Sequence, residues 1–172
     1  MESRKGRLNF SVESKGHSQI YSGQSASKYC RSDLTDIEGF LIRHADAEAS
    51  EPDELRRLSP EGREQARALG KQLAADGVSA DVVLTSPLLR ARETGEALAE
   101  ALACTSEPSD GLAPGATAAT VRSAVQGRGA TVIAVGHQPD CGQIAAELGD
   151  GTEPRFPPAG MVELHLPGPS TS

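Results

Sequence analysis

The sequence predicts a single α/β domain of three layers, in which helices cover both faces of a mainly parallel sheet. From Gly39 onward, short apolar runs alternate with longer segments of helical periodicity, which is typical of successive strand–helix units. The length of 172 residues, with 37% hydrophobic and 24% charged residues, suits one ordinary globular domain. We place this domain at residues 37–168, between an N-terminal extension at 1–36 and a short tail at 169–172.

The first half of the domain is predicted to contain two strands, each followed by a helix. The apolar run at 40–42 is a short buried strand. A helix follows with Ser59 as its N-cap and a proline at its first position, and it ends at Gly77. The second strand, at 81–85, leads into a helix that we expect to begin directly after Ser86, which would be its N-cap.

The second half contains the most strand-like run of the sequence, at 131–135, which is largely β-branched. The last predicted strand alternates apolar and polar residues, which is typical of a strand at the edge of a sheet. In chain order we predict a Pro/Gly/Ser-rich loop at 106–115, a helix at 116–126, a strand at 131–135, a helix at 139–148, a turn at 156–160 and a strand at 161–166.

Composition excludes several classes of function. Seventeen Lys+Arg against 24 Asp+Glu give a net charge of −7, so the overall field does not favour nucleic acid or anionic membranes. Without a long apolar run or a secretory signal, we expect a cytoplasmic protein. The three cysteines, Cys30, Cys104 and Cys141, lack metal-site spacing and are expected to be reduced thiols. Residues 1–36 are rich in serine and lack periodicity, which indicates a disordered extension; the alternative is a docking or targeting arm.

Residues suited to binding phosphate follow three of the predicted strands. Arg43 and His44 come after the first strand, Arg90 lies shortly after the second, and His137 follows the strand at 131–135. Because the carboxyl ends of parallel strands share one edge of a sheet, we expect these side chains to meet in one cleft. Singly, each also fits a structural role, as a surface charge or a hydrogen-bonded histidine. Together they offer two guanidiniums and two imidazoles, a set that suits a compact dianion.

These residues lie in four short segments of regular spacing. The segments are Leu-Ile-Arg-His-Ala at 41–45, Leu-Ser-Pro-Glu-Gly-Arg-Glu-Gln-Ala at 58–66, Leu-Thr-Ser-Pro-Leu-Leu-Arg-Ala at 84–91 with Thr94, and Val-Gly-His at 135–137. In order and interval they resemble the successive motifs of the histidine phosphatase superfamily. Within it, the chain is most similar to the small bacterial phosphohistidine phosphatases. The resemblance runs from about Gly39 to Leu166 and implies a phosphoglycerate mutase-like fold.

The resemblance implies a hydrolase in which His44 attacks phosphorus and carries a phosphohistidine intermediate that water then hydrolyses. It implies that Arg43, Arg90 and a protonated His137 bind the phosphoryl oxygens. Ser86 and its loop are further candidates to orient the anion, although helix capping alone accounts for a serine there. The scheme requires no metal and no cofactor.

The sequence departs from the wider superfamily at three places. Ala45 replaces the usual glycine after the Arg-His pair, and Ser50 stands where phosphoglycerate mutases carry a phosphate-binding asparagine. The general acid has no clear match; Glu107 and Asp110 lie in the relevant neighbourhood, and Asp46 is a further candidate. Weak acid assistance matters little for a P–N bond, because an imidazole whose other nitrogen is protonated leaves as a neutral group.

We therefore expect a phosphatase for phosphohistidine in a signalling or phosphotransfer protein. An alternative on the same fold is a phosphomonoesterase of small metabolites, which an acid at Glu107 or Asp110 pointing into the cleft would favour. A third is a non-catalytic phosphate-binding module. The expected partner is thus a phosphorylated protein or a small phosphorylated substrate, with no nucleic acid and no membrane, and the oligomeric state stays open.

Overall fold

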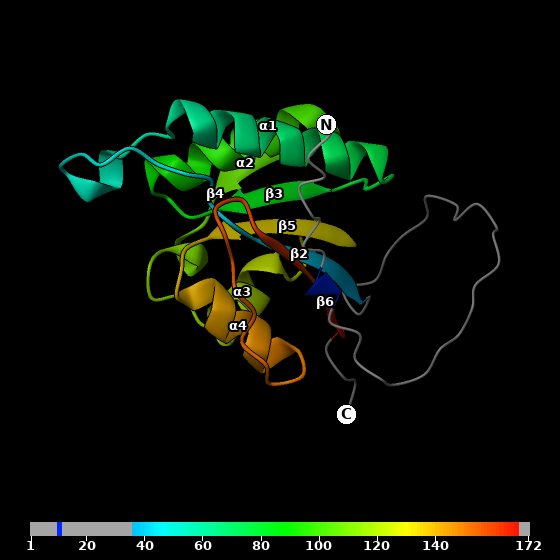
Figure 1. Cartoon of the computed structure of the whole chain (residues 1–172). Coiled ribbons are helices and arrows are strands. Elements are labelled where there is room, and N and C mark those ends of the chain that lie inside the picture. The colour runs from blue at the N-terminus through cyan, green and yellow to red at the C-terminus, as the bar shows by residue number, and fades with distance from the viewer. Residues whose placement is uncertain (1–9, 12–35, 169–172) are drawn as a thin grey trace, which may run out of the picture.

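The computed structural model describes residues 10–11 and 36–168, which form a mixed six-stranded sheet covered by helices on both faces. The strand order is β1-β6-β2-β5-β3-β4; β2, β5, β3 and β4 run parallel, and β6 is antiparallel to β2. In Figure 1, α1 and α2 lie on one face of the sheet and α3 and α4 on the other, as predicted. The strands are β1 (Phe10–Ser11), β2 (Ile37–Arg43), β3 (Val82–Thr85), β4 (Thr105–Pro108), β5 (Thr131–Gly136) and β6 (Met161–Leu166).

The helices begin largely where local sequence signals place them. Ser59 caps α1, since its hydroxyl accepts the backbone N–H of Gly62 at 3.0 Å, and Pro60 takes the first position. Thr117 and Thr120 form a reciprocal capping box at the start of α3. The helices are α1 (Pro60–Ala75), α2 (Leu89–Leu102), α3 (Ala118–Val125) and α4 (Asp140–Leu148), with short 3-10 turns η1 (Asp53–Leu55) and η2 (Asp110–Leu112).

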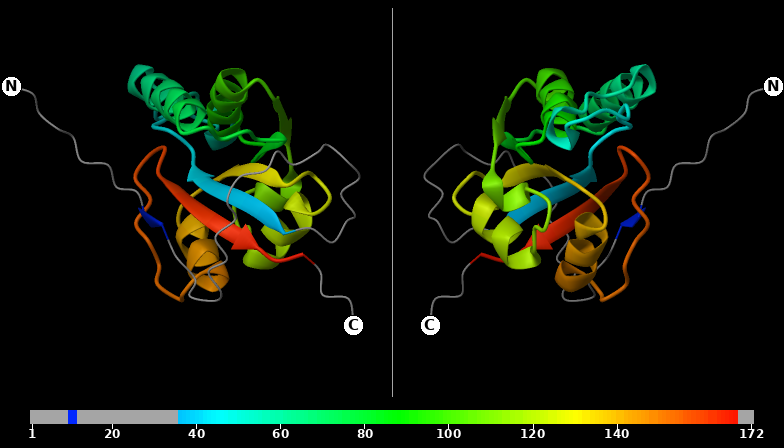
Figure 2. Two further views of the ribbon diagram at one scale, coloured as in Figure 1. Left: turned by 90° about the vertical axis from the view of Figure 1, so that its right-hand side faces the viewer. Right: turned by 90° about the vertical axis from the view of Figure 1, so that its left-hand side faces the viewer.

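The central strands β3 and β5 are largely apolar because both of their faces are buried. Neighbouring residues of β5 point to opposite layers: Val132 packs in the core shared with α3 and α4, whereas Ile133 packs in the core shared with α1 and α2. Figure 2 shows the sheet lying between the two helical layers. This packing fixes the register of β2 against β5, in which Arg43 is opposite Gly136.

The prediction of a loop throughout 106–115 is wrong in part. This segment contains most of β4, which pairs in parallel with β3 at the edge of the sheet, and the turn η2. The side chains of β4 are mostly exposed, so the strand has no apolar pattern. Its strand conformation comes instead from backbone hydrogen bonds to a neighbour that is distant in the sequence.

The predicted N-cap at Ser86 is also wrong. Helix α2 begins at Leu89, its N-cap is Leu88, and no side chain caps it. The Ser86 hydroxyl is engaged elsewhere: it accepts the Leu88 backbone N–H at 3.3 Å and is hydrogen-bonded to His137 at 2.7 Å. A serine before a proline is therefore a turn residue here rather than a helix cap.

The bounds of the strand at 161–166 are confirmed, but its place at the edge of the sheet is not. Strand β6 pairs with β2 on one side and with the two-residue β1 on the other, where Phe10 is opposite Val162.

Apart from Phe10, Ser11 and Asp36, the predicted disordered extension lies outside the described residues, and so does the tail at 169–172. Within the described part of the chain, no helix has both the length and the apolar character to cross a membrane.

Candidate active site

The ends of β2 and β5 bring the two predicted site histidines together. His44 directly follows β2, and its backbone N–H donates to the carbonyl of Gly136 at 3.0 Å, one residue before His137. The centroids of the two imidazole rings are 5.1 Å apart, with their planes inclined at 56°. The parallel pairing of the two strands thus places both rings at the same rim of the sheet.

A polar cleft of about 250 Å³ lies at this rim. Three arginines and two histidines among its lining residues carry the side chains suited to bind and react with an anion. Its lining residues are Arg43, His44, Ala45, Asp46, Ala47, Arg56, Arg90, His137, Gln138 and Pro158. Four of the residues singled out in the sequence, Arg43, His44, Arg90 and His137, therefore surround one small space.

The tautomer of His44 follows from its hydrogen bond. Its Nδ1 lies 2.7 Å from the carbonyl oxygen of Ala45. A carbonyl only accepts, so Nδ1 carries the proton and donates it. The other ring nitrogen, Nε2, then holds a free lone pair. This is the form of imidazole that attacks an electrophile.

The surroundings of His44 keep its ring neutral. Burial lowers its pKa to about 4, and the guanidiniums of Arg90, Arg43 and Arg56 act in the same direction, while the bond to Ala45 opposes them. With the pKa this far below 7, His44 is unprotonated at neutral pH.

His137 is neutral as well in the site without phosphate, whereas the expectation of a protonated ring concerned the state with phosphate bound. Burial lowers its pKa to about 3, helped by His44 and by the guanidiniums of Arg90 and Arg43, with Asp53 opposing them. Its Nε2 is 2.7 Å from the Ser86 hydroxyl. Its Nδ1 is buried and has no hydrogen-bond partner among the described residues.

Arg43 and Arg90 are each anchored through the ends of their guanidiniums. Arg43 donates from Nη1 to the carbonyl of Phe156 at 2.9 Å. Arg90, which is 6% exposed, donates from Nη1 to the carbonyl of Asp53 at 2.8 Å and pairs through Nη2 with its carboxylate at 3.1 Å. In both arginines Nε is buried without a partner in the described part of the protein. Both arginine side chains line the cleft, so their guanidinium charge lies where an anion would bind.

Arg56 is a cleft residue that the sequence reasoning missed. It donates from Nε to the carbonyl of Glu48 at 2.7 Å and from Nη1 to the Asp53 carboxylate at 3.2 Å. Asp53 thus lies between Arg56 and Arg90, and their guanidiniums hold the pKa of its carboxyl below the usual range. Arg56 belongs to a loop outside every predicted strand end. Its only signal in the sequence was its position two residues before the segment at 58–66.

Of the candidate general acids and Ser86, only Asp46 lies in the cleft among the described residues. Asp46 lines the cleft, and its carboxylate accepts the Ser59 hydroxyl at 2.5 Å. Glu107 is exposed on β4 and paired with Arg128, and Asp110 lies in η2; neither lines the cleft. Ser86 is fully buried behind His137 and does not line it either.

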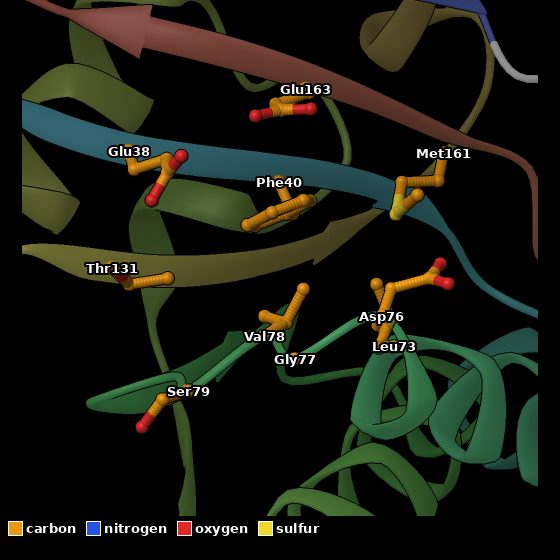
Figure 3. Close-up of a pocket in the computed structure, with 10 residues that line it drawn as sticks. All are labelled: Glu38, Phe40, Leu73, Asp76, Gly77, Val78, Ser79, Thr131, Met161 and Glu163. Atoms are coloured by element: carbon orange, nitrogen blue, oxygen red, sulfur yellow. The ribbon is translucent and has the colours of Figure 1, made fainter. Parts of the chain in front are cut away.

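A larger hollow of about 480 Å³ lies where the end of α1 faces β2 and β6 (Figure 3). Its polar rim carries the carboxylates of Glu38, Asp76 and Glu163, while its floor includes Phe40 and Met161. Negative charge at this rim disfavours a phosphate. The smaller cleft, with three guanidiniums, is therefore the candidate for phosphate chemistry. Among the residues that the structure describes, these two hollows included, no three His, Cys, Asp or Glu side chains gather as metal ligands would.

Comparisons with known proteins agree with this assignment. A family model described as the histidine phosphatase superfamily (branch 1) matches residues 40–114. The chain is 30% identical over 141 residues to the phosphohistidine phosphatase SixA of Escherichia coli, covering 76% of this chain and 86% of that protein. It is 35% identical over 123 residues to an uncharacterised protein of Picosynechococcus, covering 67% of this chain and 74% of that one. A solved structure of the protein histidine phosphatase SixA complexed with tungstate matches with a TM-score of 0.67 and 28% identity, over 74% of this chain and 86% of that chain.

Proposed function

The chain belongs to the histidine phosphatase superfamily, and from this premise we propose that it is a phosphohistidine phosphatase that works through a covalent intermediate on His44. The observation that carries the proposal is the hydrogen bond from His44 Nδ1 to the Ala45 carbonyl, in a cleft with three guanidiniums. It leaves Nε2 unprotonated where an anion would bind. The similarity to SixA of Escherichia coli supports phosphohistidine as the substrate.

The reaction proceeds in two displacements at phosphorus. First, the lone pair of His44 Nε2 forms a new P–N bond while the bond from phosphorus to the substrate imidazole breaks. The departing imidazole takes the electron pair of that bond and leaves neutral if its other nitrogen already carries a proton. A water molecule then attacks the phosphoryl group on His44, forming a P–O bond as the P–N bond breaks. Inorganic phosphate is released together with the proton that the water loses.

The cleft supplies charge where the transition state carries it. We expect Arg43, Arg56 and Arg90, which line the cleft, to bind the equatorial oxygens. The Nδ1 of His137 has no hydrogen-bond partner among the described residues and, when it carries a proton, can donate to one of these oxygens. A phosphoryl dianion beside His137 raises the pKa of that ring, because an opposite charge favours protonation. His137 is thus neutral before the substrate binds, and the arriving dianion favours its protonation.

The carboxylic acids near the cleft favour a substrate with a P–N bond over a phosphate ester. Among the described residues that line the cleft, Asp46 is the only carboxylic acid, and its carboxylate is already bonded to Ser59. Cleaving an alkyl phosphate ester expels an alkoxide that needs a proton, whereas a neutral imidazole does not. Glu107 and Asp110, which would have favoured a phosphomonoesterase, do not line the cleft.

The proposal is tested by trapping the intermediate. The protein is incubated briefly with a ³²P-labelled phosphohistidine protein and then treated with acid or alkali. We expect label that is stable to alkali, labile to acid and absent in His44→Ala. His165→Ala is the matched control, because His165 is exposed on β6 and does not line the cleft. Unlabelled wild-type protein would contradict the covalent mechanism and favour a phosphate-binding module.

Substrate class is tested separately by comparing turnover of the same phosphohistidine protein with that of a sugar phosphate. We expect a preference for the P–N substrate of at least about tenfold, equivalent to about 1.4 kcal/mol in the barrier. A clear preference for the sugar phosphate would contradict phosphohistidine as the substrate and leave the phosphomonoesterase as the better assignment.

A further inference from the structure

The peptide group between Ala45 and Asp46 is held on both sides. Its carbonyl oxygen accepts the His44 Nδ1–H at 2.7 Å, and its N–H donates to Oε1 of Gln65 at 2.9 Å. The C=O and N–H of a trans peptide point in opposite directions in one plane. The Gln65 side chain, which comes from α1, therefore fixes the plane in which the Ala45 carbonyl faces His44.

The preceding peptide group is held from the other helix. The Ala45 N–H donates to Oγ1 of Thr94 at 3.1 Å, and the Thr94 hydroxyl donates to the carbonyl of Arg90 at 2.8 Å. Thr94 is fully buried on α2, so water cannot replace these bonds. Its hydroxyl is thereby oriented with a lone pair toward Ala45. One side chain links the loop after the nucleophile to the turn of α2 that carries Arg90.

We propose that Gln65 and Thr94 are positioning residues that set the tautomer of His44. Together they hold the two peptide groups that flank Ala45, so that its carbonyl accepts from Nδ1 and Nε2 stays free to attack. The kinetic part of this inference rests on the proposed function, whereas the tautomer itself does not. Hydrogen bonds in a chain polarise one another, so the Asp46–Gln65 bond also strengthens the Ala45 carbonyl as an acceptor.

The loss of either anchor has a specific consequence. If the peptide plane rotates, Nδ1 loses its acceptor, and the ring is free to carry its proton on Nε2. The lone pair that attacks phosphorus is then lost in that fraction of molecules. Binding of phosphate depends on the guanidiniums instead. The side chains of Gln65 and Thr94 bond to none of these guanidiniums; the single link is the hydrogen bond from Thr94 to the backbone carbonyl of Arg90.

The direct test reads the proton on each ring nitrogen. ¹⁵N NMR of histidine-labelled protein at pH 7 is recorded for wild type, Gln65→Met, Thr94→Val and Thr94→Ser. We expect wild-type His44 to be protonated on Nδ1, and Gln65→Met and Thr94→Val to gain the form protonated on Nε2. Thr94→Ser keeps the hydroxyl and should restore the wild-type spectrum. Gln72→Met, the same change on the same helix with no side-chain hydrogen bond to the loop, is the control and should match wild type.

Kinetics give a second readout. The rate of phosphoenzyme formation should fall about tenfold in Gln65→Met and Thr94→Val, the effect of one lost hydrogen bond, while competitive inhibition by inorganic phosphate changes less than about twofold. Gln65 is only partly buried, so Gln65→Met should fold even if Thr94→Val does not. A folded Gln65→Met protein with the wild-type His44 tautomer would overturn the inference. A shifted tautomer in a protein that never forms a phosphoenzyme would support the inference and contradict the proposed function.

Discussion

At the scale of single residues, the cleft combines positive charge with neutral imidazoles. Three guanidiniums line it. Burial, aided by all three cations, lowers the pKa of His44 to about 4, and burial, aided by Arg90 and Arg43 among others, lowers that of His137 to about 3. The arginines that would bind a phosphate therefore add to the effect of burial in keeping the His44 ring unprotonated.

The lowered pKa of His44 predicts an unusual pH profile. Phosphoenzyme formation requires neutral Nε2, so its rate should stay within about twofold between pH 7 and pH 5 and fall only as the pH approaches about 4. An ordinary histidine, with a pKa of about 6.5, would lose about thirtyfold by pH 5. Rates are measured in single turnover with the donor below saturation, so that they report the protonation of the free protein, and spontaneous hydrolysis of the donor is subtracted. A half-maximal rate near pH 6.5 would contradict the role of burial.

At the scale of elements, α1 and the loop after His44 are in unusually close contact. A Cβ built on Gly62 would lie within 1.9 Å of the Asp46 carbonyl oxygen, and that loop also bonds to Gln65 one turn later on α1. Glycine at this position thus serves close approach of two backbones. The first turn of α1 therefore supports the loop that follows His44, the proposed nucleophile.

This contact predicts that Gly62→Ala destabilises the protein, although replacing glycine with alanine within a helix usually stabilises it. Within a helix, alanine is ordinarily better than glycine by roughly 1 kcal/mol. Here the added methyl must displace backbone, so we expect a lower urea midpoint and a slower phosphoenzyme rate. The midpoint is measured by circular dichroism. Glu61→Ala, an exposed position in the same turn, should leave both quantities nearly unchanged. A higher urea midpoint for Gly62→Ala would contradict this prediction, because it would show that the backbone at Asp46 can move away from the added methyl group without loss of stability.

At the scale of the whole molecule, two neutral buried histidines link folding to pH. Each folded-state pKa lies below the unfolded value of 6.5, so the unfolded chain binds more protons in the interval between them. Their contribution to stability is complete above about pH 6.5 and is lost progressively as the pH falls from there toward the folded-state values. The cleft that suits phosphate therefore makes the fold sensitive to mild acid.

We expect the free energy of unfolding to fall by roughly 2 kcal/mol for each of these histidines between pH 6.5 and pH 5. Urea titrations at both pH values measure this loss. His137→Asn should lose less stability over the interval than wild type, because one of the two groups is gone. His165→Ala removes an exposed ring and should behave as wild type. Equal acid sensitivity in all three proteins would contradict the linkage.

Much of the fold was predictable because it depends on local signals and apolar runs. The buried strand at 131–135 and the cap at Ser59 are encoded within a few residues. β4 was not predictable, because its exposed side chains carry no pattern and only pairing with β3 makes it a strand. The role of Ser86 was not predictable either, because its partner, His137, is 51 residues away.

The sequence by itself determined which chemistry the protein carries: arginine and histidine at the ends of three strands, in segments whose order identifies the family. The tertiary structure alone decided how that chemistry is tuned. It brought Arg56 from a loop without pattern into the cleft, took Glu107 and Asp110 out of it, and buried both imidazoles among cations. The physical reason is that residue type and local periodicity are properties of neighbours in the chain, whereas burial, charge proximity and hydrogen-bond direction depend on neighbours in space.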